Sequence, residues 1–162
     1  MKKLSYKSLY NSALLYLKRY DASEEMVRRV LKRKLLRAEP EDSPENYLPV
    51  IEEVIEDLKR LNYVNDARYA ENQGRGMALS GKSARFIAQK LIQQGVSKEI
   101  IQGVLASSEE MGTEEERALA FIHKKHLVLT RENRQKNLAK LARAGFSYET
   151  AMTALEKSSA PE

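Results

Sequence analysis

The sequence contains no cysteine and no tryptophan, only two histidines, and no long apolar run. The lack of cysteine excludes disulfides, thiol nucleophiles and most structural zinc sites, and it is consistent with a reducing compartment. The N-terminal residues lack the apolar core of a signal peptide, and no stretch approaches the length needed to cross a membrane. We therefore expect a cytoplasmic protein with no membrane partner.

A repeated helix corner is the main feature that is present. Residues 91–105 recur fifty residues later as residues 141–155, with Leu, Gly, Ser, Glu and Leu at the same spacing. The two glycines, Gly95 and Gly145, suit the left-handed residue that ends a helix, and the serines two positions later suit the cap of the next helix. Each copy is therefore predicted to be a helix, a tight corner and a second helix, as in tandem helical repeats. A weaker copy at 17–31 has aspartate in place of the glycine.

Apolar residues at three- and four-residue steps predict an all-α protein, most clearly from Leu48 to Leu61. Glycine, proline and capping residues divide the chain into nine expected helices, at roughly 7–19, 23–37, 46–61, 65–79, 83–94, 97–107, 113–126, 131–144 and 147–157. Grouped by threes, these helices predict three tandem three-helix repeats at 1–61, 62–107 and 113–157, with an acidic, proline-rich connector at 38–46 and a disordered tail at 158–162.

Two alignments of the first repeat are open. Ser23 aligns with Ser97 when helix corners are compared, and with Ser83 when whole three-helix units are compared. We prefer the second alignment because it leaves no helix without a counterpart.

Residues 76–83 match the phosphate-loop pattern G-x-x-x-x-G-K-S, in which backbone amides, the lysine and the serine bind phosphate and magnesium. That pattern requires a preceding apolar strand in a parallel sheet, whereas residues 66–75 are polar and predicted to be helical. The simpler interpretation is a turn between helices, with Gly81 as the terminator and Ser83 as the cap. We find no other catalytic constellation, and we expect neither enzyme activity nor a cofactor.

Other candidate chemistry is weak. His123 and His126 are close enough to share a helix face, but nothing nearby completes the three or four ligands that zinc needs, so no metal site is expected. Tyr63 and Tyr69 are predicted to fill the joint between helices. Four N-terminal tyrosines are less determined, and their interleaving with basic residues is a pattern that can support single-stranded nucleic acid: Tyr6, Tyr10, Tyr16 and Tyr20.

The net charge of +5 hides an alternation of basic and acidic stretches. Residues 1–37 carry 11 basic and 3 acidic groups, residues 58–94 carry 7 and 2, and residues 117–143 carry 8 and 1. Such stretches form either solvated faces with intramolecular pairs or surfaces for polyanions and acidic proteins, and the sequence leaves both open.

The run from Leu58 to Ala70, followed by Ser80-Gly-Lys-Ser83 and Leu91-Ile-Gln-Gln-Gly-Val-Ser97, resembles the central signature of the RecX family, bacterial proteins that regulate the RecA recombinase. The resemblance extends over nearly the whole chain. Asn62 stands where the family usually has glycine, but asparagine tolerates the left-handed conformation, so the turn is expected to survive.

This resemblance implies three tandem three-helix units in an elongated, curved array, right-handed or solenoid-like. It implies a negative regulator in recombination, DNA repair and the SOS response, which binds RecA and the RecA–DNA filament and inhibits ATP hydrolysis, strand exchange and co-protease activity. We expect a monomer with weak direct DNA binding. The basic residues expected to dock electrostatically are Arg28, Arg29, Lys32, Arg33, Arg75, Lys82, Arg85, Arg131, Arg134, Lys136 and Lys140.

Two other functions remain open. A helix-turn-helix regulator would read bases through the helix at 83–94, with Arg85, Gln89 and Gln93. A nucleotide hydrolase would require Lys82 to bind phosphate.

Overall fold

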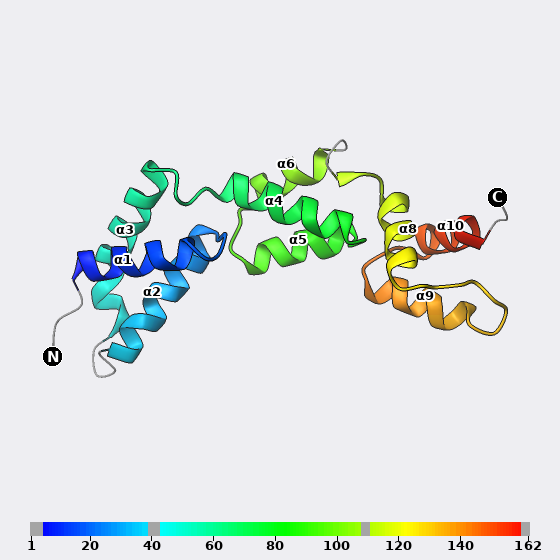
Figure 1. Ribbon diagram of the computed structural model, residues 1–162, viewed down its shortest axis with the longest axis horizontal. Helices are drawn as coiled ribbons and strands as arrows, with labels where there is room; N and C mark the ends of the chain where they lie inside the picture. The colour runs from blue at the N-terminus through cyan, green and yellow to red at the C-terminus, as the bar shows by residue number, and fades with distance from the viewer. Residues whose placement is uncertain (1–4, 39–42, 108–110, 160–162) are drawn as a thin grey trace. The chain divides into compact units, whose positions relative to one another are not determined.

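The structure is a computed structural model that describes residues 5–38, 43–107 and 111–159. These ranges contain nine α-helices, one 3₁₀ helix and no β-strand (Figure 1). The elements are α1 (Tyr6–Leu17), α2 (Glu24–Ala38), η1 (Pro44–Tyr47), α3 (Leu48–Arg60), α4 (Asp66–Leu79), α5 (Ala84–Gln93), α6 (Lys98–Ala106), α8 (Glu114–Lys124), α9 (Arg134–Arg143) and α10 (Tyr148–Ser159). The all-α prediction is confirmed, and each expected helix is present with its ends shifted by at most three residues.

The connector and the tail fall partly outside the described ranges. Within the connector, Ala38 ends α2, residues 39–42 lie outside the described residues, and η1 begins at Pro44. At the C-terminus, α10 continues through Ser158 and Ser159, and residues 160–162 are again outside. In the part of the chain that the structure describes, no helix is both long and apolar enough to span a bilayer.

The chain forms two compact units, each with its own buried apolar residues. Unit 1 consists of residues up to Tyr69 together with 94–96, and unit 2 consists of 70–93 together with residues from Ser97 onward. In unit 1, α1, α2 and α3 pack against one another in pairs. The fully buried side chains of this core include Leu9, Val27, Leu31, Ile51, Ile55 and Leu58.

Unit 2 contains two groups of packed helices. Helix α10 packs on α8 and α9, and α5 packs on α6. The buried residues of the first group include Ala118, Ile122, Leu141 and Leu155, and those of the second include Ile87, Leu91 and Ile101. Burial of side chains of this kind stabilises by about 1.5–3 kcal/mol each, so α3 and α10 are held by their apolar faces rather than by intrinsic helix propensity.

The repeated corners have the predicted backbone conformation. Gly95 has φ of 82° and Gly145 has φ of 95°, both in the left-handed region that favours glycine. Space also requires glycine, because a Cβ on Gly145 would lie 2.3 Å from the hydroxyl oxygen of Ser83. Asn62 adopts φ of 58°, so the turn at this departure from the RecX pattern survives as predicted.

Ser23 and Ser83 make the same pair of hydrogen bonds. Each hydroxyl accepts from the backbone amide three residues later and so caps its own helix. Each also donates to the carbonyl before a corner glycine, which is Gln94 for Ser23 and Ala144 for Ser83. Both serines are fully buried.

A carboxylate completes each of these two joints. The amide of Glu24 donates to Asp66 at 2.8 Å, and the amide of Ala84 donates to Glu114 at 2.7 Å. Both carboxylates occupy the first position of a helix. The contacts of Ser23 therefore match those of Ser83, which supports the alignment that compares whole three-helix units.

The two tyrosines assigned to the helix joint differ in burial. Tyr69 is 2% exposed, as predicted, and burial raises the pKa of its hydroxyl to about 12. The prediction for Tyr63 is wrong, because its side chain is 53% exposed. Val64 takes the buried position after the turn at Asn62 and is 2% exposed.

Candidate partner-binding surface

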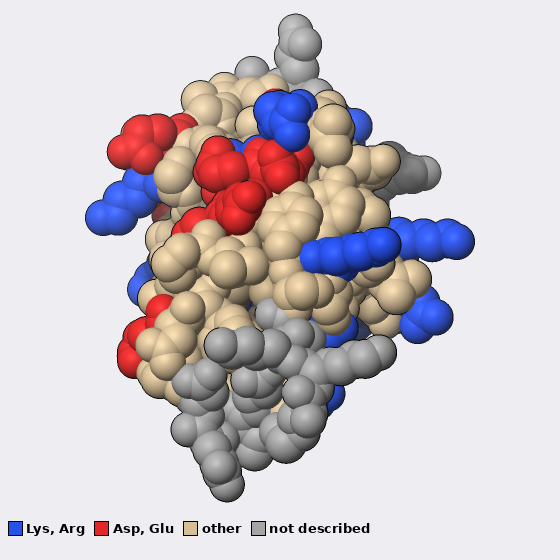
Figure 2. All heavy atoms as spheres, turned by 90° about the vertical axis from the view of Figure 1, so that its left-hand side faces the viewer, with Lys and Arg blue, Asp and Glu red and all other residues tan. Residues whose placement is uncertain are grey.

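Helix α2 carries the first group of predicted contact residues. Its apolar residues Val27, Leu31 and Leu35 recur at four-residue steps and are buried in unit 1, so the intervening cations lie on the remaining faces. Figure 2 views the molecule from the side on which Figure 1 draws α1, α2 and α3. Acidic side chains gather in the upper half of this face, and Lys and Arg side chains project mostly at its edges.

Arg28 is engaged within unit 1 and is not available as an exposed contact. Its guanidinium donates to both carboxylate oxygens of Glu52, at 2.6 and 2.8 Å, and to Glu25 at 2.7 Å. The hydrogen bond from Arg28 lowers the pKa of the Glu52 carboxyl, and Lys32 adds a nearby positive charge that lowers it further. This bidentate pair ties α2 to α3.

The other three predicted contacts on α2 differ in exposure and pairing. Arg29 is exposed and pairs with Glu25 at 3.0 Å. Lys32 is half-buried, and Arg33 is exposed and lines a pocket. Of the two exposed arginines, only Arg29 forms an ion pair with another described residue.

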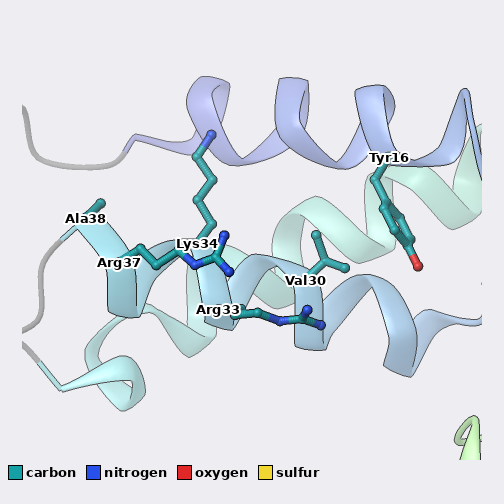
Figure 3. Close-up of a pocket in the computed structure, with 6 residues that line it drawn as sticks. All are labelled: Tyr16, Val30, Arg33, Lys34, Arg37 and Ala38. Carbon is teal, nitrogen blue, oxygen red and sulfur yellow. The ribbon is translucent and has the colours of Figure 1, made fainter.

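The pocket lies between α1 and α2 and has a volume of about 540 Å³. Its lining residues are Tyr16, Val30, Arg33, Lys34, Arg37 and Ala38 (Figure 3). Three of them, Tyr16, Lys34 and Arg37, were not among the predicted contacts. The four-residue spacing of Arg33 and Arg37 in a basic helix is the sequence feature that points to this pair.

The predicted contacts of residues 75–85 are spread over two helices. Arg75 is exposed on α4 and has an interaction within the chain, and Arg85 is exposed on α5. The ammonium of Lys82 lies 4.6 Å from the ring centroid of Phe86, which places the cation over the aromatic face. Its side chain is half-buried.

A helix, α5, follows the phosphate-loop pattern, but the strand that the pattern requires before it is absent from the described residues. The first four residues of the pattern, 76–79, belong to α4, so a helix stands where the motif requires a strand. Ser83 is fully buried, and its hydroxyl is hydrogen-bonded to the carbonyl of Ala144 and to the amide of Phe86. The interpretation of Gly81 and Ser83 as a helix terminator and cap is confirmed.

Helix α9 and the turn before it carry the last group of predicted contacts. Arg131, Arg134 and Lys136 are exposed, and Lys140 is half-buried. The guanidinium of Arg134 lies 3.6 Å from the sulfur of Met152. A pocket of about 440 Å³ is lined by Leu129, Thr130, Arg131, Arg134, Gln135, Met152 and Glu156.

The remaining candidates are surface residues. On α5, Arg85 and Gln89 are exposed, and Gln93 is exposed and has an interaction within the chain. His123 is exposed in the last turn of α8, and His126 is exposed with φ of 49°. Within the described residues, no three histidine, aspartate or glutamate side chains are grouped to hold a metal ion.

These observations define a class of protein, an all-helical scaffold that repeats one helix corner and carries exposed cations on α2, α5 and α9. Residues 65–105 match a family model described as RecX, second three-helix domain. A regulatory protein RecX from Myxococcus xanthus (strain DK1622) is 36% identical over 168 residues, which cover 98% of this chain and 90% of the relative. The chain belongs to the RecX family of regulatory proteins.

Other relatives agree with this assignment. A regulatory protein RecX from Neisseria gonorrhoeae is 33% identical over 82% of each chain. A regulatory protein RecX from Streptococcus uberis is 33% identical over 62% of this chain, and the matched region covers 40% of that longer relative. The crystal structure of RecX from Lactobacillus salivarius covers 94% of this chain and 95% of that chain with a TM-score of 0.68 and 24% identity, which supports the fold.

Proposed function

We propose that this protein is a negative regulator of the RecA recombinase, which binds RecA and the RecA–DNA filament and inhibits ATP hydrolysis, strand exchange and co-protease activity. The observation that carries this proposal is the 36% identity to a RecX protein over 98% of the chain. The exposed cations support it, because a nucleoprotein filament offers phosphate and protein carboxylates together.

The predicted contact residues have different roles in this proposal. Arg33, Arg85, Arg131 and Lys136 are exposed and form the main docking set. Arg28 is structural, because its guanidinium is committed to Glu52. Weaker contributions come from the other predicted contacts: Arg29, Lys32, Arg75, Lys82, Arg134 and Lys140.

The proposal includes an organisation into three three-helix repeats, at 1–61, 62–107 and 113–157, in a monomer that acts by binding alone. The matching hydrogen bonds of Ser23 and Ser83 support this organisation. Separate basic groups on successive repeats suit a partner that is itself a repeating polymer.

The test follows ATP hydrolysis by RecA on single-stranded DNA at several salt concentrations, with substoichiometric amounts of this protein. We expect inhibition that weakens as salt rises, because the Debye length falls from about 10 Å at 0.1 M to about 3 Å at 1 M. Hydrolysis that is unchanged at low salt contradicts the proposal.

Matched double variants locate the contact. Arg85→Ala with Arg131→Ala removes two charges of the docking set, and Lys90→Ala with Lys98→Ala removes two exposed charges outside it. We expect the first pair to weaken inhibition more than the second. A sequence-specific DNA footprint in the absence of RecA would instead indicate the helix-turn-helix function, with α5 as the recognition helix.

A further inference from the structure

The pocket between α1 and α2 contains more positive charge than the other pockets described for this chain. Its lining includes Arg33, Lys34 and Arg37 and no carboxylate. Figure 3 shows these three side chains projecting from α2 and Tyr16 projecting from α1. The site is therefore a cationic groove with a partly apolar floor.

The two arginines of the groove are available to a ligand. Arg33 and Arg37 are exposed, and neither guanidinium has a hydrogen bond or ion pair with another described residue. They lie one helical turn apart, where side chains share a face. By contrast, the ammonium of Lys34 donates to the hydroxyl of Ser12, which fixes it between the two helices.

An aromatic surface continues from the groove along the end of α1. The rings of Tyr16 and Tyr20 have centroids 5.1 Å apart and an interplanar angle of 39°. Tyr20 is 56% exposed, and Lys18 and Arg19 between the two tyrosines are exposed as well. Tyr16 therefore lies both in the groove, with Arg33 and Arg37, and beside the exposed ring of Tyr20.

We propose that this groove binds one segment of single-stranded DNA, with its phosphates against Arg33 and Arg37 and its bases against the rings of Tyr16 and Tyr20. Guanidinium groups hydrogen-bond phosphate in a bidentate manner, and every base has a face that can stack on an aromatic ring. A carboxylate peptide would use the arginines but would leave the tyrosine pair without a function. The choice of DNA as the nucleic acid rests on the proposed function, since the RecA filament contains it.

The experiment measures binding of a fluorescein-labelled oligothymidylate by anisotropy over a range of salt concentrations, without RecA. Each phosphate contact to a single strand contributes about 0.7 to the slope of log affinity against log salt, so Arg33→Ala with Arg37→Ala should reduce the slope by about 1.4. The control pair Lys90→Ala with Lys98→Ala should leave the slope unchanged. Thermal unfolding of both variants verifies that the fold is intact.

The aromatic part of the groove is tested separately. Tyr20→Ala should weaken binding by about fivefold or more, and Tyr20→Phe should retain it, because stacking requires the ring and not the hydroxyl. Wild-type affinity in the alanine variant overturns the stacking role of this residue.

Three outcomes overturn the proposal. One is an equal loss of salt dependence in the arginine pair and in the lysine control. Another is tighter binding of a glutamate-rich peptide than of the oligothymidylate, together with weaker binding of that peptide by the variant that lacks both arginines. The third is tighter binding of oligouridylate. The DNA-binding assay contains no RecA, so the two proposals fail separately. If the protein binds the oligothymidylate through the groove but does not inhibit ATP hydrolysis by RecA, only the proposed function is refuted. If it inhibits RecA but does not bind the oligothymidylate through the groove, only the groove proposal is refuted.

Discussion

Replacement of Ser83 by alanine tests the buried hydrogen bonds on which the corner of unit 2 depends. The hydroxyl is fully buried, accepts from the amide of Phe86 at 3.0 Å and donates to the carbonyl of Ala144 at 2.9 Å. Loss of the helix cap costs about 1 kcal/mol. Removal of the donor to the buried carbonyl costs about 1–3 kcal/mol more. We therefore expect a total destabilisation of about 3 kcal/mol.

Ser97→Ala is the matched control for this substitution. Ser97 is exposed, and its hydroxyl accepts from the amide of Ile100 at 3.4 Å as a helix cap. Its replacement should cost about 0.5–1 kcal/mol. The difference between the two variants isolates the bond to Ala144.

Thermal unfolding followed by circular dichroism measures this difference. A loss of about 3 kcal/mol lowers the melting temperature of a chain of this size by roughly 6–12 °C. Urea unfolding provides a second measure of the free energy change. If Ser83→Ala is no more destabilising than Ser97→Ala, the assignment of Ser83 to a buried hydrogen-bonded joint is refuted.

Four further substitutions have defined outcomes. Gly145→Ala should destabilise the protein by about 2 kcal/mol or more in thermal unfolding, because φ is 95° and the new Cβ would clash with Ser83. The control Gly76→Ala, which has nothing within 4 Å of its Cβ, should stabilise the protein by about 0.5–1 kcal/mol. Equal effects of the two substitutions contradict this account. The lowered pKa of Glu52 adds stability that is present above the ordinary value of 4.5 and is lost as pH falls through the lower folded pKa. Because the Glu52 side chain is 46% exposed, Glu52→Gln should lower the free energy of unfolding by only about 0.5–1 kcal/mol at neutral pH. The same substitution should make the free energy of unfolding less dependent on pH in the acid range. If that pH dependence is unchanged, the role of the Glu52 pair with Arg28 is refuted. Arg117→Met should cost about 2–4 kcal/mol in urea unfolding, since its buried guanidinium donates to two carbonyls of the preceding turn, and a neutral result would contradict that role.

Much of the fold follows from local sequence patterns. Helix positions follow from the spacing of apolar residues, and helix ends follow from capping residues, such as Thr113, which forms a capping box with Glu116. The corner glycines were predictable for the same reason, because the left-handed conformation is a property of one residue and its neighbours. The RecX signature was likewise readable from a contiguous run, Leu58 to Ala70.

The candidate site was only partly predictable. Arg28 and Arg33 are both basic residues of one helix, yet one is paired with Glu52 and the other is accessible. The groove depends on Tyr16 from a different helix, and no sequence pattern joins it to Arg37. Tyr63 and Tyr69 were both predicted to fill the joint between helices, yet only Tyr69 is buried.

The sequence by itself determined the helices, their corners and the family, because backbone conformation and capping depend on residues within a few positions of each other. The tertiary structure decided which serines, cations and tyrosines are engaged. The hydroxyl of Ser23 donates to a carbonyl 71 residues away, and Arg28 reaches a carboxylate 24 residues away. Hydrogen bonds and ion pairs require atoms within a few ångströms, and only the packing of helices brings such distant residues together.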